Sequence, residues 1–147
     1  MSKTKKTKKV ALRKKLGGAG NRSVVSSIFF GIGDGSNSVS TGEIGMHPGM
    51  PCDYEIIGWA IAAKGSSPTC TVDLWVKAAG TAIPTVSDTI MGTKPALASG
   101  NAVQSTTMLN WKSGQPIRGK QGDILIANLD AVSNATRVTI KFDYIRI

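Results

Sequence analysis

The feature that most constrains the fold is a two-residue alternation of apolar and polar side chains at residues 135–147, ATRVTIKFDYIRI. Its apolar positions are Val138, Ile140, Phe142 and Tyr144, and its polar positions are Arg137, Thr139, Lys141 and Asp143. Successive residues of a β-strand point to opposite faces of a sheet, so the pattern predicts a half-buried strand. No window of the chain keeps the 3.6-residue period of a helix.

Further segments have the length and composition of strands. Residues 71–77, TVDLWVK, alternate in the same way: Val72, Leu74 and Val76 share one face, and Thr71, Asp73, Trp75 and Lys77 share the other. The remaining strand candidates are residues 23–32, a short strand within 39–55, residues 56–63 and 122–129, and short edge strands near 104–111. Residues 64–68, KGSSP, predict a hairpin loop between 56–63 and 71–77. We expect an all-β body of about seven or eight short antiparallel strands, closed as a β-sandwich or jelly roll.

Charge divides the chain into two parts. Residues 1–22 contain nine basic side chains and no acidic one, whereas residues 23–147 contain nine of each, so the whole net charge of +9 belongs to the first part. The nine are Lys3, Lys5, Lys6, Lys8, Lys9, Arg13, Lys14, Lys15 and Arg22. A run this basic repels itself, and the glycine-rich residues 17–21 form a flexible joint after it. We predict a basic arm at 1–22, disordered when alone, and one domain at 23–147.

The arm has the composition of an electrostatic anchor. It lacks the apolar stretch of a secretory signal, and no segment of the chain is apolar for the length of a membrane span, so we expect a soluble protein made in the cytoplasm. Its cations could bind an acidic protein surface or neutralise phosphates, while Val10, Leu12 and Leu16 fill small apolar pockets. Because the arm has no aromatic residue, any contact with nucleic acid would be non-specific. A merely solubilising tail is the alternative.

Motifs for catalysis or for cofactors are weak. Cys52, Cys70 and His47 are too few for a zinc site, and the two cysteines are expected to be free thiols, with a disulfide as the alternative. Asp53 and Glu55 would share a face of an extended segment, but such pairs are common on solvated strands. We therefore predict no enzyme, no cofactor and no metal.

The tryptophans suggest contact surfaces. Trp59 shares a face with Ile57 and Ile61, which predicts a core position. Trp75 shares a face with Asp73, so we expect it to be partly exposed and to lie at a subunit interface. A carbohydrate-stacking platform made by Trp59, Trp75 and Trp111 is the alternative.

The body resembles a β-sandwich module of virion proteins from tailed bacteriophages. The resemblance spans about residues 28–147 and depends on the order and spacing of short motifs. They are Ile57–Trp59, Val72–Trp75, Pro84–Ile90, Lys94–Pro95, Asn110–Trp111, Gly122–Leu125 and Thr136–Thr139. The module resembled occurs in head-fibre, tail-fibre and minor structural proteins, as trimers, usually behind other domains. Here its only attachment is the arm.

The resemblance implies a structural or adhesive role in a virion assembled in the host cytoplasm. The leading hypothesis is a capsid decoration or head-attachment protein, a homotrimer bound to capsid or other virion proteins through the arm. One alternative is a receptor-binding head- or tail-fibre tip that contacts host glycan. Another is a jelly-roll coat protein whose basic arm faces the genome.

Overall fold

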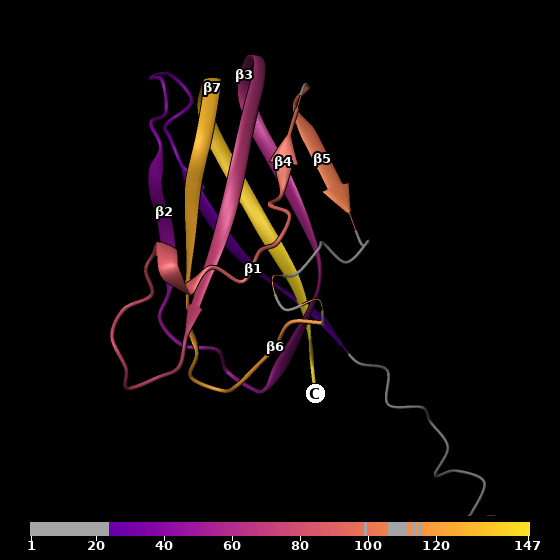
Figure 1. The fold of residues 1–147 in the computed structure, drawn as a ribbon. Coiled ribbons are helices and arrows are strands. Elements are labelled where there is room, and N and C mark those ends of the chain that lie inside the picture. Colours follow the sequence, from indigo (N-terminus) through magenta and orange to yellow (C-terminus); the bar gives the residue numbers. More distant parts are fainter. Residues whose placement is uncertain (1–23, 99, 106–111, 113, 115) are drawn as a thin grey trace, which may run out of the picture.

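The computed structural model describes residues 24–147 apart from residues 99, 106–111, 113 and 115. In this part of the chain there are seven strands and one short 3-10 helix, and no α-helix (Figure 1). The strands are β1 (Val25–Ile32), β2 (Gly42–His47), β3 (Tyr54–Lys77), β4 (Ala96–Leu97), β5 (Ala102–Ser105), β6 (Arg118–Gly119) and β7 (Ile124–Arg146), and the 3-10 helix is η1 (Val86–Asp88). The seven strands belong to one antiparallel hydrogen-bonded sheet, which confirms the predicted all-β class.

Two long strands organise the sheet. β3 has 24 residues and β7 has 23, and they pair with each other from Tyr54↔Arg146 to Lys77↔Ile124. The predicted hairpin at 64–68 is therefore wrong, because the two halves of β3 hydrogen-bond to β7 and not to each other. The expectation of short strands is wrong for β3 and β7, since each predicted pair of strands is one continuous strand.

Both long strands bend sharply at the same level. The pairing register shifts on either side of Gly65, and Ser67 and Asn134 have φ values of 51° and 53°. A Cβ atom on Gly65 would lie 1.8 Å from the carbonyl oxygen of Asn134, so only glycine fits this close approach. Figure 1 shows β3 and β7 passing over the top of the molecule, with one half of each strand behind the other half.

The bend divides the strands into two sets. The first strand set has the order β1, β7 (residues 138–145), β3 (residues 54–63) and β5. The second strand set has the order β2, β7 (residues 124–129), β3 (residues 70–77) and β4. β6 adds a short pairing to the start of β3.

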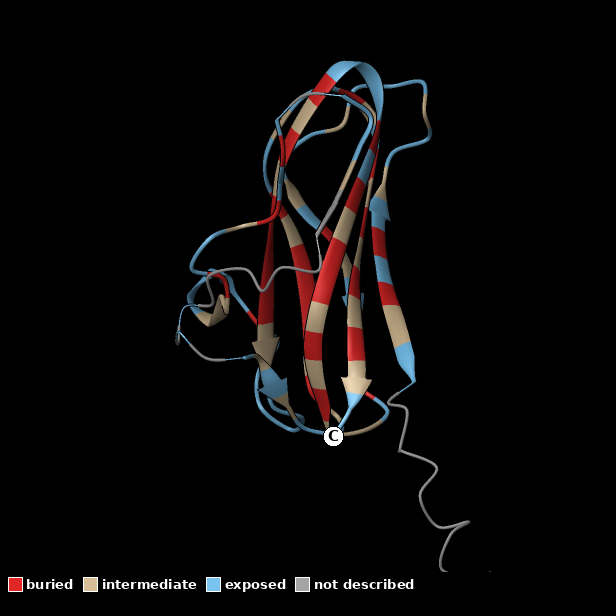
Figure 2. Cartoon of the chain, turned by 90° about the vertical axis from the view of Figure 1, so that its right-hand side faces the viewer, coloured by how far each residue is buried: buried red, intermediate tan, exposed pale blue. Residues whose placement is uncertain are grey.

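Apolar side chains from both sets form one core. The predicted apolar face of residues 135–147 is confirmed: Val138, Ile140 and Phe142 are fully buried, and Tyr144 is nearly so. Figure 2 shows buried positions alternating with more exposed ones along the strands. The core also contains Leu74 and Leu125 of the second set. The two sets approach closely, since a Cβ atom on Gly45 of β2 would lie 3.0 Å from the Phe30 ring of β1.

Within the described residues there is no helix long and apolar enough to cross a membrane. The arm at residues 1–22, with every residue predicted to anchor it, lies outside the described part of the chain, and so does Trp111.

Candidate functional site

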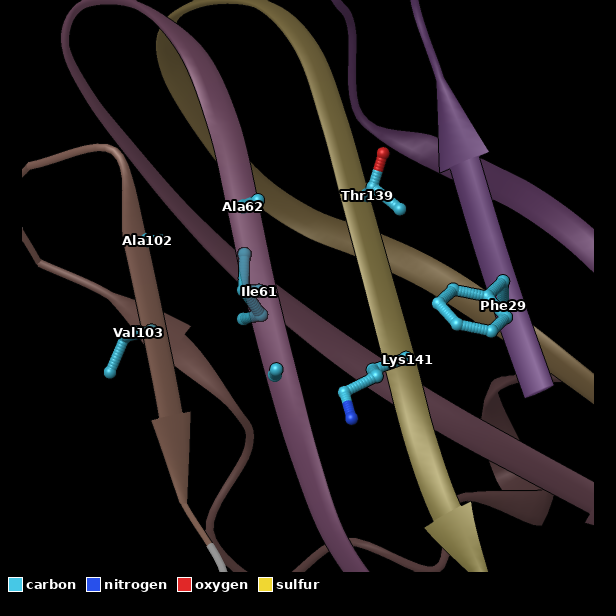
Figure 3. A pocket seen from close by; sticks show the side chains of 8 residues that line it. Phe29, Ile61, Ala62, Ala102, Val103, Thr139 and Lys141 are labelled. Carbon is cyan, nitrogen blue, oxygen red and sulfur yellow. The ribbon is translucent and has the colours of Figure 1, made fainter. Parts of the chain in front are cut away.

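The outer face of the first strand set carries a hollow of about 320 Å³ that is lined mainly by apolar groups (Figure 3). Its outward-facing lining residues are Phe29 of β1, Thr139 and Lys141 of β7, Ala60 and Ala62 of β3, and Ala102 of β5. The strand register explains why they meet. Phe29 lies opposite Lys141, which lies opposite Ala60, and Thr139 lies opposite Ala62 in the next row.

The hollow follows from side-chain size on this face. Because Ile140 and Phe142 point into the core, their neighbours on β7 must point outward. The alanines of β3 and β5 are too short to cover the sheet next to Lys141, whereas Phe29 stands above it with 67% of its surface exposed. An exposed aromatic ring beside an apolar hollow is typical of a surface that contacts another molecule.

Lys141, which lines the hollow, belongs to a polar pair on this face. The Lys141 ammonium lies 2.9 Å and 3.0 Å from the two carboxylate oxygens of Asp143, and the Ser27 hydroxyl donates to the same carboxylate. Partial burial alone would raise the pKa of Asp143, but the bonds from Ser27 and Lys141 hold this pKa below its ordinary value. The pair is thus internally neutral and adds no net charge to the face.

The apolar lining and the exposed Phe29 ring of this face suit contact with another molecule. The Asp143 carboxylate beside them is bound by Lys141 and Ser27. Among the described residues, no group of three His, Cys, Asp or Glu side chains could hold a metal ion.

A buried carboxylate, Asp73, organises the outer side of the second strand set. Its side chain is fully buried and accepts hydrogen bonds from the Leu74 amide (2.8 Å), the Trp75 indole (2.9 Å) and the Thr89 hydroxyl (2.6 Å), and it forms an ion pair with Lys94 (3.1 Å). Sequence analysis placed Asp73 on an outward face and missed this role. The expectation that Trp75 is partly exposed is wrong, because only 7% of its surface is accessible, and it offers little area to a second subunit.

Lys94 links this carboxylate to β7. Its ammonium also contacts Asp130, which accepts a hydrogen bond of 2.6 Å from the Asn128 amide. The hydrogen bond to Asp130 and the contact with Asp73 raise the pKa of Lys94 although its partial burial acts in the opposite direction. The network thereby joins three of the motifs behind the resemblance, at residues 72–75, 84–90 and 94–95. These motifs have a shared structural task, which is to fasten the segment between β3 and β4 to the sheet.

The other candidate residues from the sequence form surface ion pairs or belong to the core. Asp53 pairs with Lys120 and Glu55 with Arg118, so each carboxylate binds a neighbouring cation on the surface. Trp59 is a core residue, as predicted, with 8% of its surface exposed. Because Trp59 and Trp75 are both buried, these two rings do not form an exposed stacking platform.

The cysteines are free thiols, as predicted. Cys70 is buried and Cys52 half-buried, and burial raises the pKa of the Cys70 thiol. His47 lies at the end of β2, half-buried, and its Nδ1 atom has no hydrogen-bond partner among the described residues.

Comparison of the chain with protein-family models, curated proteins and solved structures found no match.

Proposed function

We propose that this protein is a structural component of a tailed-bacteriophage virion, a capsid decoration or head-attachment protein held on the particle by its basic arm. The resemblance in the order and spacing of the motifs at residues 57–59, 72–75, 84–90 and 94–95 supports the virion class. Three of these motifs also meet in one buried network in the body. The body is the exposed part of the particle, and it self-associates there.

We further propose that the body is a jelly-roll sandwich in which the two strand sets are the two sheets. If each half of β3 and β7 counts as one strand, the body has eight main strands in addition to β6. When these eight strands are numbered along the chain, their spatial order is 1-8-3-6 in one set and 2-7-4-5 in the other. This is the arrangement of a jelly roll. Closure of the two sets over one core supports this arrangement.

The division of charge is the single observation on which the anchoring proposal depends most. In the body, six of the nine acidic residues form ion pairs with neighbouring cations, so the body's own charges are largely satisfied. The nine unbalanced cations all belong to residues 1–22. Ordering such an arm costs about 1–2 kcal/mol per residue, and many copies bound to one lattice offset this cost better than one isolated partner.

The partner of the arm is an acidic surface of capsid or other virion proteins. Lys3, Lys5, Lys6, Lys8, Lys9, Arg13, Lys14 and Lys15 supply the ionic contacts, and Val10, Leu12 and Leu16 supply the apolar ones. Non-specific contact with packaged nucleic acid is the outcome that would point instead to the coat-protein alternative.

The test compares the full chain with a variant that lacks residues 2–16, using co-sedimentation with particles that lack the protein. We expect the deleted chain to keep its far-UV circular dichroism spectrum and to lose particle binding. A matched control replaces the arm's lysines by arginine, which keeps the charge and should keep binding. Binding that survives the deletion would refute the anchoring role, and equally tight binding of the full chain to non-specific DNA would favour a genome-facing arm.

A further inference from the structure

Strand β1 differs from every other strand at the border of a set. It is eight residues long, VSSIFFGI, with no charged residue and no proline, and β7 is its only hydrogen-bonded neighbour among the described residues. The other border strands are short or irregular: β4 has two residues, β5 has four, and β2 carries a register shift between Glu43 and Gly45.

An unpaired strand border presents a row of free N–H and C=O groups that can pair with another strand. Proteins usually block this pairing by keeping such strands short, or by placing charges, prolines or bulges in them. β4, β5 and β2 have one or more of these features, and β1 has none. Its outward side chains Val25 and Phe29 are also apolar and more than half exposed.

We infer that β1 pairs antiparallel with β1 of a second copy of this chain, so that the first strand sets of two molecules form one continuous sheet. The inference rests on the self-association in the proposed function and names its surface. A second copy fits because β1 is uncharged, so its pairing with itself brings no like charges opposite each other.

The arms favour the antiparallel direction. Each arm enters at the Val25 end of β1, and antiparallel pairing places the two Val25 ends at opposite ends of the strand pair. Eight residues of strand span about 25 Å, which is well beyond the screening length of about 8–10 Å at physiological salt. Parallel packing of β1 would bring two segments of charge +9 together. The arrangement is two-fold and thus differs from the trimer that the resemblance implies.

The pairing also explains the exposed ring of Phe29. Residues directly opposite each other in a strand pair point to the same face, with Cβ atoms about 4.5–5.5 Å apart. With Phe29 opposite its own copy, the two rings meet on the outer face beside the hollow, and Ile28 of one copy lies opposite Phe30 of the other on the core side. The Phe29–Phe29 and Ile28–Phe30 contacts of the pair are then apolar, and in the same register Ser26 lies opposite Ile32.

Analytical ultracentrifugation of the full chain and of Phe29→Lys tests the inference. Met46→Lys is the matched control, because Met46 is also exposed (52%) and lies on β2 at the border of the second set. We expect concentration-dependent dimers for the full chain and for Met46→Lys, and monomers for Phe29→Lys. Hydrogen exchange should show slow β1 amides on the side away from β7 in the dimer, and fast exchange of these amides in Phe29→Lys.

A full chain that stays monomeric up to its solubility limit would overturn the inference. So would a dimer or trimer that survives Phe29→Lys, or β1 amides that are equally slow in the monomer, which would indicate another occupant of this border. The arm deletion separates the two proposals: it should leave the dimer intact while particle binding is lost. A monomeric Phe29→Lys chain that still reaches the particle would leave the anchoring role standing.

Discussion

Replacing Asp73 by alanine should destabilise the body strongly. The carboxylate is fully buried and joins β3, through Leu74 and Trp75, to the segment that carries Thr89 and Lys94. Asp73→Ala removes the acceptor for all four groups at once. The segment between β3 and β4 then loses its main polar attachment to the sheet.

The size of the effect follows from which donors water can reach. Thr89 and Lys94 are partly exposed and can turn to solvent, but the Leu74 amide and the Trp75 indole belong to buried residues. A buried donor without an acceptor costs about 1–3 kcal/mol, so two of them cost about 2–6 kcal/mol. We expect a loss of about 2–6 kcal/mol from a total stability of about 5–15 kcal/mol.

Asp53→Ala is the matched control. Asp53 forms an ion pair with Lys120 at 2.9 Å, close to the 3.1 Å between Lys94 and Asp73, but the side chains of Asp53 and Lys120 are 39% and 80% exposed. Surface pairs contribute little, so this loss should be much smaller. Urea unfolding followed by far-UV circular dichroism measures both losses without depending on the fluorescence of Trp75. Equal losses in the two variants would refute the assignment of Asp73 as a buried organiser.

Two further predictions concern a glycine and an acid. Gly119→Ala should lower the thermal unfolding midpoint, at a cost of about 1–3 kcal/mol, because its Cβ atom would lie 2.2 Å from the Tyr54 ring. Gly49→Ala, whose nearest neighbouring atom would be 3.7 Å away, should not, and similar midpoints would contradict this account. The Asp34 carboxylate accepts backbone hydrogen bonds, foremost from Asn37, which lower its pKa from 3.8 to about 2. Its contribution to stability is therefore complete above about pH 3.8 and is lost as the pH falls through about 2, and an NMR titration midpoint near 3.8 would contradict the assignment.

Alternation in the sequence identified which face of a strand is buried, but not which strands pair with each other. In residues 135–147 the pattern gave the correct buried side, because the period of a strand depends only on local backbone geometry. At residues 64–68 the composition marked a real change of direction, and the hairpin was still wrong. The bend depends on β7, far away in the sequence, where Asn134 lies against Gly65. Pairing partners of strands are non-local, so turn composition alone does not select them.

The same limit explains the error at Trp75. Its alternation correctly separated Trp75 and Asp73 from Leu74, but it did not reveal that a later segment satisfies the second face through Thr89 and Lys94. The hollow beside Phe29 was also missed. The sequence shows two adjacent phenylalanines, and only the register with β7 decides that Phe30 points inward and Phe29 outward.

The two proposed contacts should respond differently to salt, and this difference connects them to the structure. Binding through the arm depends on the eight cations between Lys3 and Lys15, so it should weaken steeply as ionic strength rises. Pairing through β1 uses backbone hydrogen bonds and apolar side chains, including Phe29 and Val25, and neither depends on screening. High salt should therefore release the protein from a particle as dimers, because the uncharged β1 strands stay paired while the ionic contacts of the arm dissociate. Release as monomers under these conditions would mean that the lattice, and not β1, holds neighbouring copies together.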